Sequence, residues 1–208
     1  MRLRTIVAAL AAMSCGLMSG SPARAGVPGN CVQLQDARLT ISSCTEFLDT
    51  HPASSDDQAM AYFYRGTALS AGERFDEAIE DLGRAIAAGP AWPLPYNNRA
   101  RAFDAKGEPA KAIADYDKVL ELSPANAAAY VNRALAYVKL KDFDHALTDL
   151  QKGDELKPNT AFVIYNIGEV YAMKGDLARA EAEYRKALAI VPRNQHVIDG
   201  LKRIGATP

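Results

Sequence analysis

The sequence predicts an all-α fold in which helical hairpins of equal length stack in one row, an α-solenoid. Two sets of residues recur every 34 positions: the prolines Pro90, Pro124, Pro158 and Pro192, and the alanines Ala78, Ala112, Ala146 and Ala180. Large and small residues also recur at spacings of four and three, which places them on one face of a helix. A period of this length is typical of stacked helix pairs. Such arrays usually serve as binding surfaces rather than as catalytic cavities.

The first 25 residues have the pattern of a secretory signal peptide. Arg2 and Arg4 precede an apolar run at residues 6–13 that is too short to span a bilayer, and residues 23–25 form an A-x-A cleavage signature. We expect the mature chain to begin at Gly26 and to be exported, in a bacterium to the periplasm. The alternatives are an uncleaved membrane anchor and lipidation at Cys15, where Ala12 replaces the usual leucine three residues earlier.

Removal of this segment takes away three arginines and no acid, which leaves 21 basic and 25 acidic side chains and a net charge of −4. Mildly acidic, scattered charge argues against a nucleic-acid partner, which would require a basic face. No later segment is apolar enough to cross a bilayer, so we expect no membrane span in the mature chain.

Residues 26–58 are expected to form an N-terminal cap and a linker. Residues 39–48 carry apolar side chains at helical spacing and resemble a degenerate helix over the first repeat, and residues 51–57 read as the linker. Export would place Cys31 and Cys44 in an oxidising compartment, which favours a disulfide, with two reduced and packed thiols as the alternative. The bond would close a loop between the two cysteines and contribute about 3 kcal/mol of stability in the chain-entropy model.

Four frames of this repeat length follow, at 59–92, 93–126, 127–160 and 161–194, and each is expected to hold two helices. In the first helix of each frame a large, a small and a large residue share one face, and in the second helix the recurring alanine allows close approach of its neighbour. We interpret these positions as core. The first-helix sets are Tyr62, Gly66 and Leu69; Tyr96, Ala100 and Phe103; Tyr130, Ala134 and Tyr137; and Ile164, Gly168 and Tyr171.

Turn residues separate the two helices of each frame. Gly72, Gly107 and Gly175 lie at these turns in the first, second and fourth frames, and the prolines follow the second helix. The third frame has Lys141-Asp142 instead of glycine, so its inner turn is expected to be more strained. Residues 195–208 are expected to hold a closing helix over the fourth frame, with apolar residues at helical spacing between 197 and 204.

The period, the alanines, the aromatic residues and the prolines together resemble the tetratricopeptide repeat family over residues 59–194. The resemblance implies a right-handed α-solenoid. Arginines on the first helices and aspartates on the second helices further resemble a variant common in exported bacterial members. The fourth repeat departs from this variant, with Ile167 and Glu183 at the matching places. The pairs in the first three repeats are Arg65 and Asp81, Arg99 and Asp115, and Arg133 and Asp149.

The fourth repeat lacks both the arginine and the aspartate. We therefore predict that each arginine contacts an aspartate of its own frame or of a neighbouring frame. A partly buried pair of this kind sets the register between helices more than it adds stability. The alternative is a row of arginines that binds anionic ligands.

The family resemblance implies a concave peptide-binding groove lined by the free faces of the first helices. In this chain those positions are Phe63, Thr67 and Ser70; Asn97, Arg101 and Asp104; Val131, Leu135 and Val138 with Lys139; and Phe162, Tyr165 and Glu169. Asn98, Asn132 and Asn166 recur beside them, and an amide can both donate to and accept from a peptide backbone. The asparagines either hold an extended peptide or only bridge neighbouring helices. The lysine-rich clamp of some members for terminal carboxylates is not reproduced.

No pattern of catalysis, cofactor binding or metal binding is expected. His51, His145 and His196 are scattered between the linker, a second helix and the closing helix, and there is no glycine-rich phosphate loop. We therefore expect a non-enzyme that binds a peptide or protein segment and acts as an adaptor or assembly factor in the cell envelope. The alternative is a structural or self-associating subunit that uses the convex face or the end caps.

Overall fold

The computed structural model describes residues 26–50, 54–89 and 91–207, and every regular element in them is a helix. The predicted signal peptide, Cys15 and Pro90 lie outside the described residues, as do residues 51–53 of the expected linker. The helices are α1 (Ala37–Thr50), α2 (Ser55–Ala71), α3 (Phe75–Ala88), α4 (Pro93–Ala105), α5 (Pro109–Leu122), α6 (Ala127–Lys139), α7 (Phe143–Leu156), α8 (Ala161–Met173), α9 (Leu177–Ile190) and α10 (Gln195–Arg203). The predicted all-α solenoid is confirmed.

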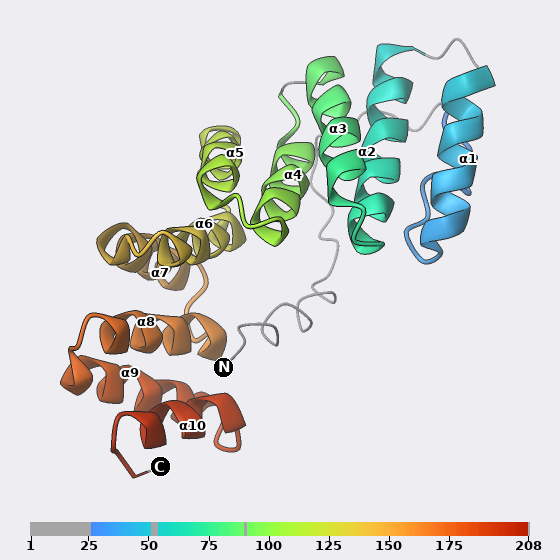
Figure 1. Ribbon diagram of the computed structural model, residues 1–208. Coiled ribbons are helices and arrows are strands. Elements are labelled where there is room, and N and C mark those ends of the chain that lie inside the picture. The colour runs from blue at the N-terminus through green and yellow to red at the C-terminus, as the bar shows by residue number, and fades with distance from the viewer. Residues whose placement is uncertain (1–25, 51–53, 90, 208) are drawn as a thin grey trace.

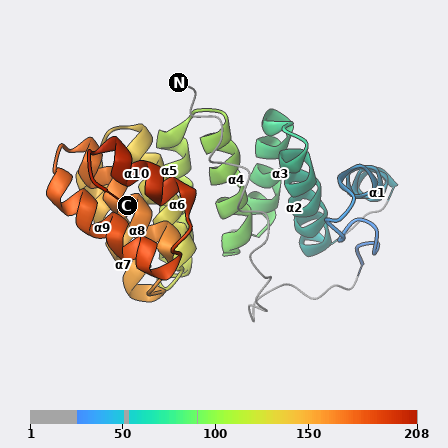
Figure 2. The ribbon, with the colours of Figure 1, turned by 90° about the horizontal axis from the view of Figure 1, so that it is seen from below.

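The helices follow one another in chain order along a bent array (Figure 1). Each helix packs mainly on its neighbours in sequence, most extensively within the pairs α2 and α3, α4 and α5, α6 and α7, and α8 and α9. The first helices α4, α6, α8 and α10 lie toward the inside of the bend, and α5, α7 and α9 lie toward its outside (Figure 1). In the view from below, α1, α2, α3 and α4 follow one another across the picture, and α5 to α10 overlap (Figure 2).

The first repeat begins earlier than the sequence pattern indicates. Ser54 is the N-cap of α2: its hydroxyl accepts a hydrogen bond from the Asp57 amide at 3.2 Å and donates to the Asp57 carboxylate at 2.8 Å. Asp56 and Asp57 also place negative charge in the first turn, where the helix dipole favours it. Residues 55–57, expected in the linker, are therefore helical.

The left-handed residue of each inner turn recurs every 34 positions, at Glu73, Lys141, Gly107 and Gly175, with φ of 59°, 61°, 79° and 82°. Gly72 has φ −88°, so the residue that needs conformational freedom in the first repeat is Glu73 and not the glycine before it. A side chain in this region costs about 1 kcal/mol, so the turns at Glu73 and Lys141 are the strained ones.

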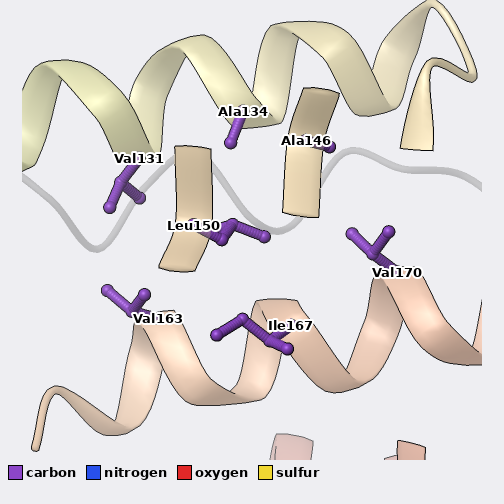
Figure 3. Close-up of a cluster of buried hydrophobic side chains, with 7 residues drawn as sticks. All are labelled: Val131, Ala134, Ala146, Leu150, Val163, Ile167 and Val170. Atoms are coloured by element: carbon purple, nitrogen blue, oxygen red, sulfur yellow. The ribbon is translucent and has the colours of Figure 1, made fainter. Parts of the chain in front are cut away.

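The core lies where small residues let paired helices approach. Ala78, Ala112, Ala146 and Ala180 are each 0% exposed. A Cβ atom placed on Gly168 would lie 2.7 Å from the Tyr184 ring, so a larger residue there would separate α8 from α9. Figure 3 shows the cluster between α6, α7 and α8, in which the side chains of Val131 and Val163 point toward each other.

Both ends of the array hold half of a repeat. At the N-terminus, Cys44 of α1 precedes Ala78 by one repeat length and is equally buried, so α1 occupies the place of a second helix. A disulfide joins Cys44 to Cys31, and both pack with Phe47 of α1 and Ala61 of α2. At the C-terminus, α10 packs on α9 in the place of a further first helix. Thus α1 and α10 close the stack from opposite sides.

None of the described helices combines the length and the apolar character that a bilayer span needs.

Candidate functional site

The three arginine and aspartate pairs lie inside their own helix pairs. Arg65 Nε donates to Asp81 at 2.6 Å, Arg99 Nη2 to Asp115 at 2.7 Å and Arg133 Nε to Asp149 at 2.7 Å, and a second hydrogen bond makes each pair bidentate. The aspartates are only 4–5% exposed. The arginines are therefore occupied in holding each first helix to its second helix.

Within the described residues, Arg133 makes a second ion pair, which Arg65 and Arg99 do not make, whereas Arg65 Nη1 donates to the Thr45 hydroxyl of α1 at 3.0 Å. Arg133 Nη1 donates to Asp117 of α5 at 2.5 Å, so this guanidinium joins the second repeat to the third. Hydrogen bonds from Arg133 to Asp149 and Asp117 raise the pKa of the guanidinium above its usual value despite its partial burial. In the fourth repeat Ile167 replaces arginine and enters the apolar cluster of Figure 3.

Polar bonds along one face join α2 to α4, α4 to α6 and α8 to α10. Asn98 Nδ2 of α4 donates to the Thr67 hydroxyl of α2 at 2.9 Å. Lys139 of α6 donates to the Asp104 carboxylate of α4 at 3.0 Å. Arg203 of α10 forms an ion pair with Glu169 of α8. We call this surface the inner face, defined by Thr67, Arg101, Asp104, Leu135, Val138, Lys139, Tyr165, Glu169, Ala172 and Arg203.

Two residues expected to line the groove are core residues instead. Phe63 is 6% exposed and packs against Trp92, with ring centroids 4.5 Å apart. Val131 is 8% exposed and belongs to the cluster with Val163 and Leu150 (Figure 3). Neither offers an exposed surface to a partner, because the neighbouring second helix and the following repeat cover them.

The three asparagines differ in what they already bind. Asn98 bonds to Thr67 and accepts from Asn97 at 3.3 Å. Asn166 donates to the Phe162 carbonyl of its own helix at 2.7 Å. Within the described part of the chain, the half-buried Asn132 side chain makes no hydrogen bond. The structure thus favours the bridging role for Asn98 and leaves Asn132 as the amide best able to meet a ligand.

The remaining predicted groove positions lie on the inner face and differ in exposure. Arg101 is exposed, whereas Leu135 and Val138 are half-buried and Val138 packs at the edge of the cluster in Figure 3. Phe162 is half-buried against the same cluster. Burial raises the pKa of the Asp104 carboxyl, although the hydrogen bond from Lys139 opposes this effect. Repeat two is therefore polar on this face, and repeat three is apolar.

A network of polar groups joins α8, α9 and α10 at the C-terminal end of the inner face. The Tyr184 hydroxyl donates to Glu169 Oε1 at 2.5 Å, and Arg203 Nη2 donates to the same hydroxyl at 3.3 Å. Tyr165 lies beside them with its ring 5.7 Å from that of Tyr184, and burial raises the pKa of Tyr165 to about 12. Tyr165 and Glu169 thus already interact with the groups of α9 and α10 at this end.

Next to this network lies a hollow of about 310 Å³, which we call the C-terminal pocket. It is lined by Glu169, Ala172, Met173, Leu177, Arg203 and Ile204. Met173 and Leu177 are 47% and 48% exposed, so the pocket wall includes apolar surface that a ligand could cover. Of these lining residues, only Glu169 is among the groove positions predicted from the sequence. Arg203 follows Glu169 by one repeat length, and Ala172 follows Val138 by the same interval, so the period would have placed both on the inner face.

A second hollow, of about 190 Å³, lies over the first repeat. Its three arginines are all paired: Arg65 with Asp81, Arg74 with Glu77 and Arg84 with Glu80. Among the described residues, no three or more histidine, cysteine or acidic side chains gather as metal ligands do. This hollow has no unpaired charge with which to recognise an ion.

Sequence comparisons place repeats over the second half of the chain. A model described as TPR repeat matches residues 100–141, and models described as Tetratricopeptide repeat match residues 127–160 and 161–194. No curated protein sequence is significantly similar to this chain.

Solved structures similar to this one include other helical repeat proteins. The crystal structure of MamA is 22% identical with a TM-score of 0.70, over 76% of this chain and 90% of that one. YrrB, described as a TPR protein with an unusual peptide-binding site, is 21% identical with a TM-score of 0.66, over 80% and 92%. The first TPR of Spaghetti (RPAP3), bound to HSP90 peptide SRMEEVD, is 24% identical with a TM-score of 0.55, over 57% and 94%. At these identities the likeness shows the fold.

Proposed function

Because the chain is a tetratricopeptide repeat protein, we propose that it is an exported interaction module that binds a peptide or protein segment along its inner face. In this role it serves as an adaptor or assembly factor in the cell envelope. Proteins of this family are typically non-catalytic scaffolds for protein interaction.

The observation that carries this proposal is the continuous inner face. The bonds of Asn98, Lys139 and Arg203 join α2 to α4, α4 to α6 and α8 to α10, and the apolar cluster packs α6 against α8. A chain lying across the helices would therefore contact several repeats at once. Half-buried Leu135 and Val138 offer apolar area, and Asn132 offers an amide for the ligand backbone. Affinity would come mainly from apolar burial, with polar groups setting the register.

Two of the similar structures support a peptide as the ligand. One was solved with an HSP90 peptide, and the other is described by its peptide-binding site. Export is supported by the signal-peptide pattern of residues 1–25 and by the disulfide between Cys31 and Cys44, which would persist in an oxidising compartment.

A charge placed on the inner face should weaken binding without unfolding the protein. Peptides selected from a phage-displayed random library on the mature protein would be synthesised, and their affinities measured by fluorescence anisotropy. We expect Leu135→Glu to weaken them at least about tenfold, because a carboxylate would be buried against an apolar ligand.

The matched control is Leu156→Glu, which makes the same change at an exposed leucine of α7 away from the inner face. Its affinity should equal that of the unmodified protein, and both variants should keep their melting temperatures. Unchanged affinity in Leu135→Glu would refute the inner face as the binding surface.

A further inference from the structure

One charge on the inner face has no counterpart. The helices α4, α6 and α8 carry the charged residues Arg99, Arg101, Asp104, Arg133, Lys139 and Glu169. Arg99 and Arg133 are paired with buried aspartates, Lys139 is paired with Asp104, and Glu169 is paired with Arg203. Arg101 is exposed, and among the described residues no acid lies within ion-pair distance of it. The inner face therefore carries one uncompensated positive charge in a chain that is acidic overall.

Apart from one ion pair, the C-terminal pocket is lined by apolar side chains. Its charged members Glu169 and Arg203 neutralise each other, and Glu169 also accepts a hydrogen bond from the Tyr184 hydroxyl. The remaining walls are Ala172, Met173, Leu177 and Ile204. An aliphatic or aromatic side chain placed there would bury the exposed surface of Met173 and Leu177, whereas a charged one would meet no free partner.

We propose, on the basis of the function proposed above, that the bound segment combines an internal acidic side chain for Arg101 with an apolar side chain for the C-terminal pocket. Arg101 lies on α4 and the pocket begins on α8, two steps along the row of first helices. Packed helices lie about 8–10 Å apart, so the two anchors are separated by on the order of 20 Å. An extended peptide rises about 3.3 Å per residue, which sets the two anchors about six residues apart.

A carboxylate side chain fits Arg101 better than other anions do. A phosphoryl group is usually met by several cations, but Lys139 and Arg203 are committed to Asp104 and Glu169. A single guanidinium matches one carboxylate in a bidentate geometry. Since Arg101 lies in the middle of the array, a segment that continues in both directions can reach it, so the acid need not be a chain terminus.

The test is a phage-displayed random peptide library selected in parallel on the mature protein, on Arg101→Glu and on Arg193→Glu. The Arg193 variant makes the same charge change at an exposed turn residue between α9 and α10. We expect the unmodified protein and Arg193→Glu to enrich peptides with an acidic residue about six positions from a large apolar residue. Arg101→Glu should instead enrich a basic residue at the acidic position.

Synthetic versions of an enriched peptide complete the test. Replacing its acid by the amide should weaken binding to the unmodified protein about tenfold but leave binding to Arg101→Glu unchanged, and amidation of its C-terminus should have no effect. Met173→Ser should weaken peptides that carry the apolar anchor and not truncated peptides that lack it.

Several outcomes would overturn the inference. They are enrichment without an acidic residue, the same consensus from Arg101→Glu as from Arg193→Glu, or a requirement for a free C-terminal carboxylate. These results differ from failure of the proposed function, in which the enriched peptides would bind Leu135→Glu as well as the unmodified protein.

Discussion

At the scale of single residues, Asp154 stands out because it carries a carboxylate where the other repeats are apolar. Ile86, Leu120 and Leu188 occupy the equivalent positions in the first, second and fourth repeats. Asp154 Oδ1 is buried and has no hydrogen-bond partner among the described residues. Burial raises the pKa of the Asp154 carboxyl, and the nearby Glu183 adds to the effect, while Lys186 opposes it. The charged form of Asp154 is therefore less favourable in the folded protein than in the unfolded chain.

We expect Asp154→Leu to stabilise the protein by about 1 kcal/mol at neutral pH. An acid whose folded pKa is raised incurs its penalty above the unfolded pKa of about 4 and is relieved of it below that value. The gain should therefore shrink as the pH falls toward 3, which urea unfolding at the two pH values would measure. Gln151→Leu, at an exposed position of the same helix, is the control and should give no such pH dependence.

At the scale of helices, the bidentate arginine and aspartate pairs hold each first helix to its second helix. Asp115 is 5% exposed, and its two oxygens accept from Arg99 Nε and Nη2 at 2.8 and 2.7 Å. Such a pair contributes geometry more than net stability, because the desolvation of both charges offsets their attraction. Removal of one partner is costly, since it leaves a buried charge alone.

Arg99→Leu should lower the free energy of unfolding by about 2–4 kcal/mol, measured by urea denaturation. The double variant Arg99→Leu with Asp115→Leu should recover much of this loss. The control is Arg84→Leu, because Arg84 pairs with Glu80 on the surface and both side chains are at least half exposed. Its expected cost is below about 1 kcal/mol. An equal cost for Arg99→Leu and Arg84→Leu would contradict the structural role.

At the scale of the whole molecule, both ends of the stack resist further stacking. Gly66, Ala100, Ala134 and Gly168 occupy the small position where a first helix meets its second helix, and the next member of this series is the exposed Lys202 of α10. A lysine there would have to be buried before another second helix could pack. At the opposite end, the disulfide-linked segment around Cys31 covers α1.

We therefore expect the mature protein to be a monomer by multi-angle light scattering at micromolar concentration. This measurement also separates the proposed interaction module from the alternative of a self-associating envelope subunit. A concentration-dependent dimer or a polymer would favour the alternative.

Much of this fold follows from the sequence because the array is repetitive and each repeat contacts only its neighbours. A period of 34 in alanine and proline, together with helical spacing within each period, is enough to predict helix pairs and their order. The exceptions are local: α2 begins at Ser55 because Ser54 caps it, and the strained turn residue is Glu73 rather than Gly72.

Which side chains are exposed on the inner face could be read only from the tertiary structure. Spacing along one helix identifies a face, but not what a neighbouring helix places over it. Trp92 covers Phe63, the cluster of α6, α7 and α8 encloses Val131, and Thr67 occupies the amide of Asn98. The C-terminal pocket is likewise formed by side chains of α8, α9 and the C-terminal end around α10. Whether Arg101 is paired also depends on the side chains of neighbouring helices. The sequence by itself determined the stacked helices, since periodicity is a local property, and only the tertiary structure decided which side chains remain free for a partner.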